Sequence, residues 1–288
     1  MTKNSFQDDM LALVFKTHIF PKVHTQEVMQ VLQIDMNTDT GESFGRWKLG
    51  NDEQLLSFVT SANIACGMHA GDPVVMDYTV GKCVEKGVSI GAHPAFPDIQ
   101  GFGRRDMKMS LQEIESYVLY QIGALRCFAE SLGAKLAHVK PHGALYNMAA
   151  ADLDIALSVA RAVARGGKDL VLVGLAGSLM LEAANKVGIP GASEGFCDRA
   201  YNPDGTLVSR SKPGAVITGV DEIAQRAVKM VKDHVVFTPD GKETPLTVDT
   251  ICVHGDTTGA ADIAKVIRQH LVENGVEVVP LPRLVSSR

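Results

Sequence analysis

Residues 34–43 read IDMNTDTGES and place a dense set of polar side chains directly after an apolar run. In a β-strand, successive side chains point to opposite faces. Asp35, Asn37 and Asp39 would therefore share one face of the strand, while Met36 would face the other way. Such a polar row either lies on a solvated edge or forms the wall of a polar pocket. The arrangement of the remaining strands decides between the two.

Strand-like and helix-like segments alternate along the rest of the chain. Including the opening strand there are about eight strands, and the further candidates lie in or end at residues 62–66, 88–92, 136–140, 169–174, 190–196, 249–254 and 276–281. Helix signals stand between them: Asp72-Pro73, a capping box at Ser110 and Glu113, and periodic runs at 152–165, 178–187, 220–233 and 258–274. This alternation is typical of a parallel (β/α)8 barrel, with a doubly wound open sheet as the alternative. A hairpin turn is expected at residues 239–245.

The domain organisation follows from length and from the position of the first strand. A chain of 288 residues without internal repeats or low-complexity linkers fits one large domain. Met29 comes just before the first clear strand, so we expect a single domain at residues 29–288 and an accessory extension at residues 1–28. That extension is acidic early and lacks the features of a secretory signal or a transit peptide.

Composition excludes several classes of protein. The net charge of -5 and the pI near 6.0 argue against nucleic acid or an anionic membrane as the main partner. Apolar runs stay well short of the roughly 18 residues that cross a bilayer. Five widely spaced cysteines without a CxxC pair indicate buried apolar residues in a reducing, cytoplasmic setting rather than a zinc knuckle or a disulfide framework.

Polar clusters recur where the predicted strands end. They occur in SANIACGMHAGDP, IGAHPAFPD, HVKPHGALY, EGFCDRAY and CVHGD, as well as after the opening strand. In parallel α/β folds the C-terminal ends of the strands meet at one rim, where active sites lie. We therefore expect the polar row of residues 34–43 to be one sector of a ring of side chains.

Structural roles are the alternative for each of these residues. A single histidine near a strand end is often a satisfied core residue, Lys140 can pair with a carboxylate, and Asp198 with Arg199 can form an internal salt bridge. The GFGRR segment containing Arg104 suits an anion clamp. The sequence lacks the GxxxxGK[ST] motif, and we favour carboxylate and histidine chemistry acting on water or an amide.

Seven longer motifs resemble the LamB/YcsF family. In chain order they are IDMNTDTGESFGRWKLG, SANIACGMHAGDP, IGAHPAFPDIQGFGRR, HVKPHGALYN, SEGFCDRAY, SRSKPGA and TICVHGD. They extend from about residue 34 to residue 256 and cover most of the chain. Departures from the family pattern are small, for example Met68 in place of a frequent phenylalanine, and none removes an ionisable group.

The resemblance implies a fold and an activity. The fold is a distorted (β/α)7-8 barrel similar to the glycoside hydrolase/deacetylase superfamily. The activity is that of the A subunit of an ATP-dependent 5-oxoprolinase, which opens the lactam of 5-oxoproline to L-glutamate together with subunits B and C. ATP with Mg²⁺ is the expected cofactor, engaged jointly with those partners, and no tightly bound metal is expected. A homo-oligomer is left open.

The site residues follow from the motifs together with this activity. Our hypothesis has Asp35 or Asp39 act with His142 as general base on water, His69 or His93 protonate the ring nitrogen, and Lys140 or Arg104 hold an anionic group. The predicted catalytic residues are Asp35, Asp39, His69, His93, Lys140 and His142, and the predicted substrate-binding residues are Asn37, Glu42, Asn63, Arg104, Asp198, Arg199, His254 and Asp256.

Two other functions fit the same residues. In a metal-dependent amide hydrolase, Asp39, His69 and His142 would supply three ligands and leave a position open, although HExxH-type spacing is missing. In a non-catalytic subunit, the same pocket would only present 5-oxoproline to partner subunits. Elemental analysis of the protein, with activity measured before and after chelation, tests for a metal-dependent hydrolase. Binding of 5-oxoproline without turnover would identify a non-catalytic subunit.

Overall fold

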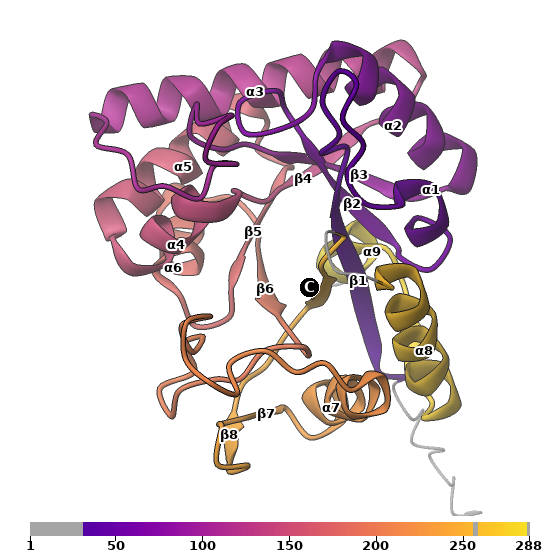
Figure 1. Cartoon of the computed structure of the whole chain (residues 1–288). Coiled ribbons are helices and arrows are strands. Elements are labelled where there is room, and N and C mark those ends of the chain that lie inside the picture. The colour runs from indigo at the N-terminus through magenta and orange to yellow at the C-terminus, as the bar shows by residue number, and fades with distance from the viewer. Residues whose placement is uncertain (1–30, 256–258, 287–288) are drawn as a thin grey trace, which may run out of the picture. The chain divides into compact units, whose positions relative to one another are not determined.

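Parallel strands close into a barrel at the centre of the molecule (Figure 1). The computed structural model describes residues 31–255 and 259–286. The barrel strands are β1 Gln33–Thr40, β2 Ser61–Ala65, β3 Ser89–His93, β4 Leu136–Val139, β5 Val171–Leu175, β6 Gly191–Gly195 and β9 Thr250–Val253. Strand β9 pairs with β6 on one side and with β1 on the other, so the sheet closes on itself. The predicted distorted barrel is therefore confirmed with seven strands, and the doubly wound alternative is wrong.

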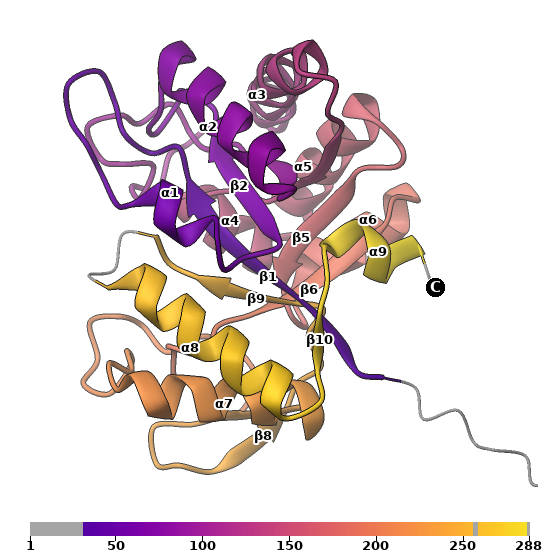
Figure 2. The same cartoon turned by 90° about the vertical axis from the view of Figure 1, so that its right-hand side faces the viewer.

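Short strands outside this ring complete the sheet structure. Strand β10, Glu277–Val278, pairs in parallel with the first residues of β1 (Figure 2). Strands β7, Val235–Phe237, and β8, Glu243–Pro245, form an antiparallel hairpin. The expected hairpin turn at residues 239–245 is confirmed by this pairing.

Helices follow most of the barrel strands. They are α1 Asp52–Leu55, α2 Pro73–Lys86, α3 Leu111–Ser131, α4 Gly143–Ala151, α5 Leu153–Gly166, α6 Leu179–Val187, α7 Val220–Lys232, α8 Ala260–Glu273 and α9 Leu281–Ser286. The side chain of Asp72 caps α2 directly before Pro73, and Ser110 with Glu113 forms the predicted capping box of α3. Helices α7 and α8 lie side by side (Figure 2). Within residues 31–255 and 259–286, every helix is too short or too polar to cross a membrane.

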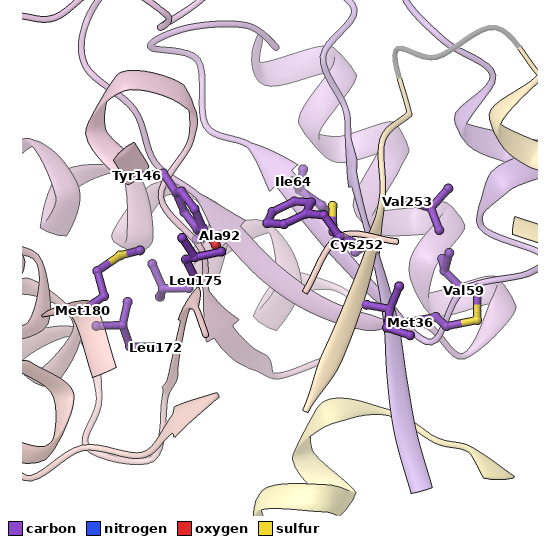
Figure 3. Close-up of a cluster of buried hydrophobic side chains, with 14 of the residues drawn as sticks. Met36, Val59, Ile64, Ala92, Tyr146, Leu172, Leu175, Met180, Cys252 and Val253 are labelled. Carbon is purple, nitrogen blue, oxygen red and sulfur yellow. The ribbon is translucent and has the colours of Figure 1, made fainter. Parts of the chain in front are cut away.

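The main hydrophobic core combines buried side chains of the barrel strands and of the helices, some of which are drawn in Figure 3. Met36, Ile64 and Leu172 contribute from the strands, and Met180 contributes from α6. Burying a side chain of this size stabilises the fold by about 1.5–3 kcal/mol. Gly174 is required here because a Cβ atom at this position would lie 2.8 Å from the Cβ of Met180.

The interior of the barrel is divided into an apolar and a polar part. Val171, Val173 and Ala192 from β5 and β6 form a small apolar cluster with Leu281 of α9. The inward side chains of β1 are instead carboxylates and an amide, which need hydrogen-bond partners when buried. The predicted boundary before Met29 lies outside the described residues and stays a prediction.

Candidate active site

The first polar residue of β1 lies deep in the barrel. The carboxylate of Asp35 accepts hydrogen bonds from Thr60 Oγ1 at 2.8 Å, Ser61 Oγ at 2.6 Å and Thr250 Oγ1 at 2.5 Å. These donors come from the N-terminal ends of β2 and β9, so Asp35 belongs to the floor of the barrel. Burial raises the pKa of Asp35 from 3.8 to about 6, although the three hydroxyl donors oppose this shift.

The second polar residue of β1 joins the floor to the mouth. The amide nitrogen of Asn37 donates to Thr250 Oγ1 at 2.7 Å and to Glu194 Oε1 at 3.0 Å. Its amide oxygen accepts from Asn63 Nδ2 at 2.7 Å and from Lys140 Nζ at 3.3 Å. All of its hydrogen-bonding groups are thus used within the barrel, which gives Asn37 a supporting role beneath the mouth.

The third polar residue of β1 forms a charge network at the mouth. Lys140 Nζ lies 2.9 Å from Asp39 Oδ1 and 2.7 Å from Glu194 Oε1, and Asn63 Nδ2 donates to the same Asp39 oxygen at 2.9 Å. Burial alone would raise the pKa of Asp39, but its interactions with His93 and with the ammonium group of Lys140 outweigh this effect and hold the pKa well below 3.8. Burial alone would lower the pKa of Lys140, but the surrounding charges, led by Asp39, raise it well above 10.5. Both groups are therefore ionised at neutral pH.

Three imidazoles and a carboxylate lie next to this network. His142 Nδ1 is 3.0 Å from His93 Nε2 and 3.6 Å from Glu42 Oε1, and Glu42 Oε1 is 3.2 Å from His69 Nε2. The rings of His69 and His142 are stacked with centroids 3.8 Å apart. We call Glu42, His69, His93 and His142 the imidazole cluster. All four side chains are at most 8% exposed.

The loop after β3 makes this close packing possible. Gly103 has a positive φ of 64°, and a Cβ atom there would lie 2.8 Å from His69 Cβ and 2.9 Å from His142 Cδ2. Phe102 also has a positive φ of 53°, which is uncommon for a bulky residue. The carbonyl of Phe102 accepts a hydrogen bond from His142 Nε2 at 2.9 Å. Backbone strain in this loop thus coincides with the positioning of an imidazole.

Burial controls the protonation of two rings of the imidazole cluster. It lowers the pKa of His142 from 6.5 to about 3, with a further contribution from the charge of His93. Burial also lowers the pKa of His69 well below 6.5. His69 and His142 are therefore neutral at physiological pH and present lone pairs to their surroundings.

A cavity of about 210 Å³ opens beside these groups. It is lined by Asp39, His93, Arg104, Lys140, Pro141, His142, Gly143, Ala144, Tyr146, Asn147, Phe196, Arg199, Leu207, Arg210 and His254. Most of these residues come from the ends of β1, β3, β4, β6 and β9 or from the segments that follow them. The C-terminal ends of the strands thus form one mouth, as in other parallel barrels.

The side of the cavity after β6 and β9 combines charge with an aromatic surface. His254 Nδ1 lies 3.0 Å from Asp198 Oδ2, and His254 Nε2 lies 3.2 Å from Arg210 Nη2. The ring of Phe196 stacks on His254 with centroids 5.4 Å apart. Arg199 donates to the carbonyls of Val208 and Ala215, so it holds the loop after β6 in place.

Comparisons with known proteins agree with this architecture. The LamB/YcsF family matches residues 34–286. The chain belongs to the LamB/YcsF family. The 5-oxoprolinase A subunit of Pyrococcus abyssi is 53% identical over 255 residues, which cover 88% of this chain and 100% of the relative. The 5-oxoprolinase A subunit of Clostridium beijerinckii is 49% identical and covers 88% of this chain and 99% of the relative.

A solved structure of a lactam utilization protein also matches. The crystal structure of a lactam utilization protein from Thermus thermophilus has a TM-score of 0.83 and 43% identity, covering 86% of this chain and 99% of that one. These matches confirm the predicted family and the predicted place of the chain among 5-oxoprolinase A subunits.

The structure brings most of the predicted site residues to the LamB/YcsF barrel mouth. The cavity is lined by Asp39, His93, Arg104, Lys140, His142, Arg199 and His254 from the predicted sets. Glu42 and His69 join the imidazole cluster, Asn37 and Asn63 support Asp39 from below, and Asp198 contacts His254. Asp35 stands apart at the floor, and Asp256 lies outside the described residues.

Sequence reasoning left four contributors out of the predicted site. Glu194 at the end of β6 binds Lys140, and Tyr146 on α4 donates to Glu194 Oε2 at 2.7 Å. Phe196 and Arg210 line the cavity from the loop after β6. The motifs HGALY, SEGFCDRAY and SRSKPGA contain all four residues, so their position in motifs near the strand ends was the available signal.

Proposed function

We propose that this chain is the A subunit of an ATP-dependent 5-oxoprolinase and that the cavity at the barrel mouth binds 5-oxoproline for opening to L-glutamate. The observation that carries the proposal is the joint lining of one small cavity by a carboxylate, imidazoles and arginines, namely Asp39, His93, His142, His254, Arg104 and Arg210. The similarity to known 5-oxoprolinase A subunits supports the choice of substrate.

The size and lining of the cavity suit a small, singly charged lactam. Its volume of about 210 Å³ is below the ~300–1,000 Å³ of sites for drug-sized ligands. Arg104 and Arg210 can pair with the substrate carboxylate, because guanidinium groups match carboxylates in a bidentate manner. Phe196 and Leu207 offer apolar surface to the ring methylenes. We assign the anion to the arginines because of this geometric match, and we assign Lys140 to the bridge between Asp39 and Glu194.

Asp39 is the group we assign to the attacking water. Its carboxylate is ionised and partly exposed to the cavity, with one oxygen held by Lys140 and Asn63. A fixed carboxylate can orient a water molecule toward the amide carbon and stabilise the positive charge that develops on it. We assign Asp35 to the barrel floor instead, because its oxygens are bound by three hydroxyl groups.

His254 is the group we assign to the leaving nitrogen. When water adds to the amide carbon and the C–N bond breaks, the electron pair moves to the ring nitrogen, which takes a proton. His254 lines the cavity, and Asp198 accepts a hydrogen bond from its Nδ1. Its Nε2, which lies 3.2 Å from Arg210 Nη2, would take the proton that the attacking water loses and pass it to the ring nitrogen. His93 is less suited because its side chain is only 1% exposed, against 13% for His254, and its Nε2 faces His142. His69 contacts Glu42 and stacks on His142 rather than lining the cavity.

Coupling to ATP requires partners in this proposal. Opening an unstrained amide is slow, and phosphorylation of the amide oxygen would make the carbon a better electrophile. The sequence has no GxxxxGK[ST] motif, so we assign ATP with Mg²⁺ to a site formed together with subunits B and C. The five free cysteines suit a reducing, cytoplasmic setting for that assembly.

Reconstitution tests the proposed function. The full chain, combined with B and C subunits and ATP, should release glutamate from 5-oxoproline. We expect His254→Asn to lower that rate by about 10²-fold or more, whereas Asp154→Asn, an exposed change on α5, should leave it unchanged. The Pyrococcus abyssi relative serves as positive control for the partners. If that relative supports turnover and this chain does not, the proposal is wrong. Binding of 5-oxoproline without turnover would favour a non-catalytic role.

The domain assignment is a separate part of the proposal. We assign the activity to residues 29–288 because the family match begins at residue 34. A chain without residues 1–28 should therefore support the same ATP-dependent glutamate release as the full chain. Loss of turnover or of cooperative unfolding in the shortened chain would overturn this assignment.

A further inference from the structure

Hydrogen bonds to the backbone determine which nitrogens of two rings carry protons. His93 Nδ1 lies 2.7 Å from the carbonyl oxygen of Lys140, and His142 Nε2 lies 2.9 Å from the carbonyl oxygen of Phe102. A carbonyl oxygen only accepts hydrogen bonds, so both of these nitrogens are donors. In neutral imidazoles, the other nitrogens, His93 Nε2 and His142 Nδ1, therefore carry lone pairs.

These two lone-pair nitrogens face each other. His93 Nε2 and His142 Nδ1 are only 3.0 Å apart, which is hydrogen-bond distance, yet neither ring has a proton to place between them. Asp39 Oδ2 adds a further acceptor 3.4 Å from His93 Nε2. An arrangement of convergent acceptors at this spacing is repulsive unless a positive charge lies among them.

Two more ligand atoms converge on the same point. Glu42 Oε1 is 3.6 Å from His142 Nδ1, and His69 Nε2 is 3.2 Å from Glu42 Oε1. The four ligand atoms all lie within 4.8 Å of one another. A metal about 2.1 Å from four tetrahedral ligands holds those atoms about 3.4 Å apart, so separations of this order suit a single ion.

We infer that Glu42, His69, His93 and His142 form a binding site for one divalent first-row transition metal ion, of which Zn²⁺ is the best match. Three imidazoles and one carboxylate are a ligand set that Zn²⁺ and its first-row neighbours accept, whereas Mg²⁺ and Ca²⁺ prefer oxygen ligands. The ion would bind the two facing lone pairs and thereby remove their repulsion.

The surroundings of the imidazole cluster support this site. Histidine ligands of metals usually donate their second N–H to a backbone carbonyl or a carboxylate, as His93 and His142 do here. Near the cluster, the half-buried Asp39 and the buried Glu194 are acidic in addition to Glu42, and the buried Lys140 is basic. A divalent cation would lower the excess of negative charge in this region.

The geometry selects different ligands from those suggested by the sequence. Asp39, His69 and His142 were the ligand set of the metal-dependent alternative, but Asp39 Oδ1 is bound by Lys140 and Asn63. Glu42 and His93 take its place in the imidazole cluster. The sequence-based expectation of no tightly bound metal remains untested, and metal analysis decides between that expectation and this inference.

Metal binding to the isolated full chain tests the inference independently of the proposed lactam activity. The chain is stripped with a chelator and titrated with Zn²⁺ in competition with a chromophoric indicator. We expect one ion per chain and a rise in the midpoint of thermal unfolding with added Zn²⁺. His93→Asn and Glu42→Gln should each weaken binding roughly 100-fold or more.

Matched controls separate the imidazole cluster from other histidines. His270→Asn on α8 and His254→Asn in the cavity should both keep the stoichiometry and affinity of the unmodified chain. Circular dichroism verifies that His93→Asn and Glu42→Gln are folded. The inference is overturned if the unmodified, folded chain binds Zn²⁺ no more tightly than the His93→Asn variant does. A proton shared by His93 and His142 would then explain the contact between the two rings. Loss of binding in the His254→Asn control alone would likewise overturn it.

Discussion

Asp35 and Asp39 lie on the same inward face of β1, four residues apart, but differ in burial, in hydrogen-bond partners and in the direction of their pKa shifts. Asp35 is fully buried among hydroxyl groups, and burial raises its pKa to about 6. Asp39 reaches the cavity, and its interactions with His93 and with the ammonium group of Lys140 outweigh the effect of burial and hold its pKa well below 3.8. Identical side chains thus serve the floor and the mouth of one barrel because their neighbours differ.

The floor and the mouth of the barrel also differ in how their buried carboxyl groups are stabilised. Hydroxyl donors satisfy Asp35 without adding charge, which suits a closed barrel end near Leu281 of α9. At the mouth, Lys140 bridges Asp39 and Glu194, so Asp39 stays ionised although it is largely shielded from solvent. The barrel therefore holds one carboxyl group with hydroxyl donors at its floor and binds others to an ammonium group at its mouth.

The largest expected effect is on turnover at the mouth. Asp39→Asn should lower ATP-dependent glutamate formation by about 10²–10⁴-fold, because the fixed carboxylate that orients water is lost. Turnover is measured in the reconstituted system, and urea unfolding verifies that the variant is folded. Asp35→Asn should stay within a few-fold of the unmodified chain. Equal losses in both variants would show that floor and mouth are not functionally distinct.

Removal of the bridging ammonium should destabilise the mouth. In Lys140→Met, Asp39 and Glu194 lose their shared cation, and breaking a buried pair costs about 3–5 kcal/mol of the free energy of unfolding. Repulsion between the two carboxylates should also raise the pKa of Asp39, which moves the acidic limb of the kcat/KM profile to higher pH. Lys168→Met, an exposed change, is the control. An unchanged acidic limb would contradict the assigned role of Lys140.

Asp35 at the floor should make the free energy of unfolding depend on pH. Folded Asp35 keeps its proton up to a pKa of about 6, whereas an unfolded carboxyl loses it near 3.8. Its contribution to stability is therefore complete below about pH 3.8 and is lost as pH rises through 6, a change of about 3 kcal/mol. Urea unfolding of the unmodified chain and of Asp35→Asn across this range should give free energies whose difference changes by that amount. The exposed change Asp154→Asn is the control, and its curve of unfolding free energy against pH should run parallel to that of the unmodified chain. A parallel curve for Asp35→Asn as well would refute the raised pKa of Asp35.

Two adjacent arginines provide the smallest and most specific test. Arg104 lines the cavity, while Arg105 forms an ion pair with Asp98. Loss of a charge-assisted hydrogen bond to substrate is worth about 1.5–3 kcal/mol, so Arg104→Ala should raise KM for 5-oxoproline about 10- to 100-fold. Arg105→Ala should leave KM unchanged. A larger rise in Arg105→Ala than in Arg104→Ala would place the substrate carboxylate elsewhere.

Local patterns account for the parts of the fold that could be predicted. The alternation in IDMNTDTGES predicted the shared inward face of Asp35, Asn37 and Asp39, and capping residues such as Ser110 predicted where helices begin. These signals work because side-chain direction in a strand and capping at a helix end depend on residues a few positions apart. The same patterns could not separate Asp35 from Asp39.

The family, the parallel α/β barrel and the gathering of polar residues at the strand ends were all determined by the amino-acid sequence itself. Only the tertiary structure decided how high each residue lies in the barrel and which nitrogen of each imidazole faces its neighbour. The contact between Asn37 and Glu194 joins residues 157 positions apart, and that between Asn37 and Thr250 joins residues 213 positions apart. Such pairings depend on barrel closure and on the register between strands, which arise from the packing of the whole domain rather than from any one segment.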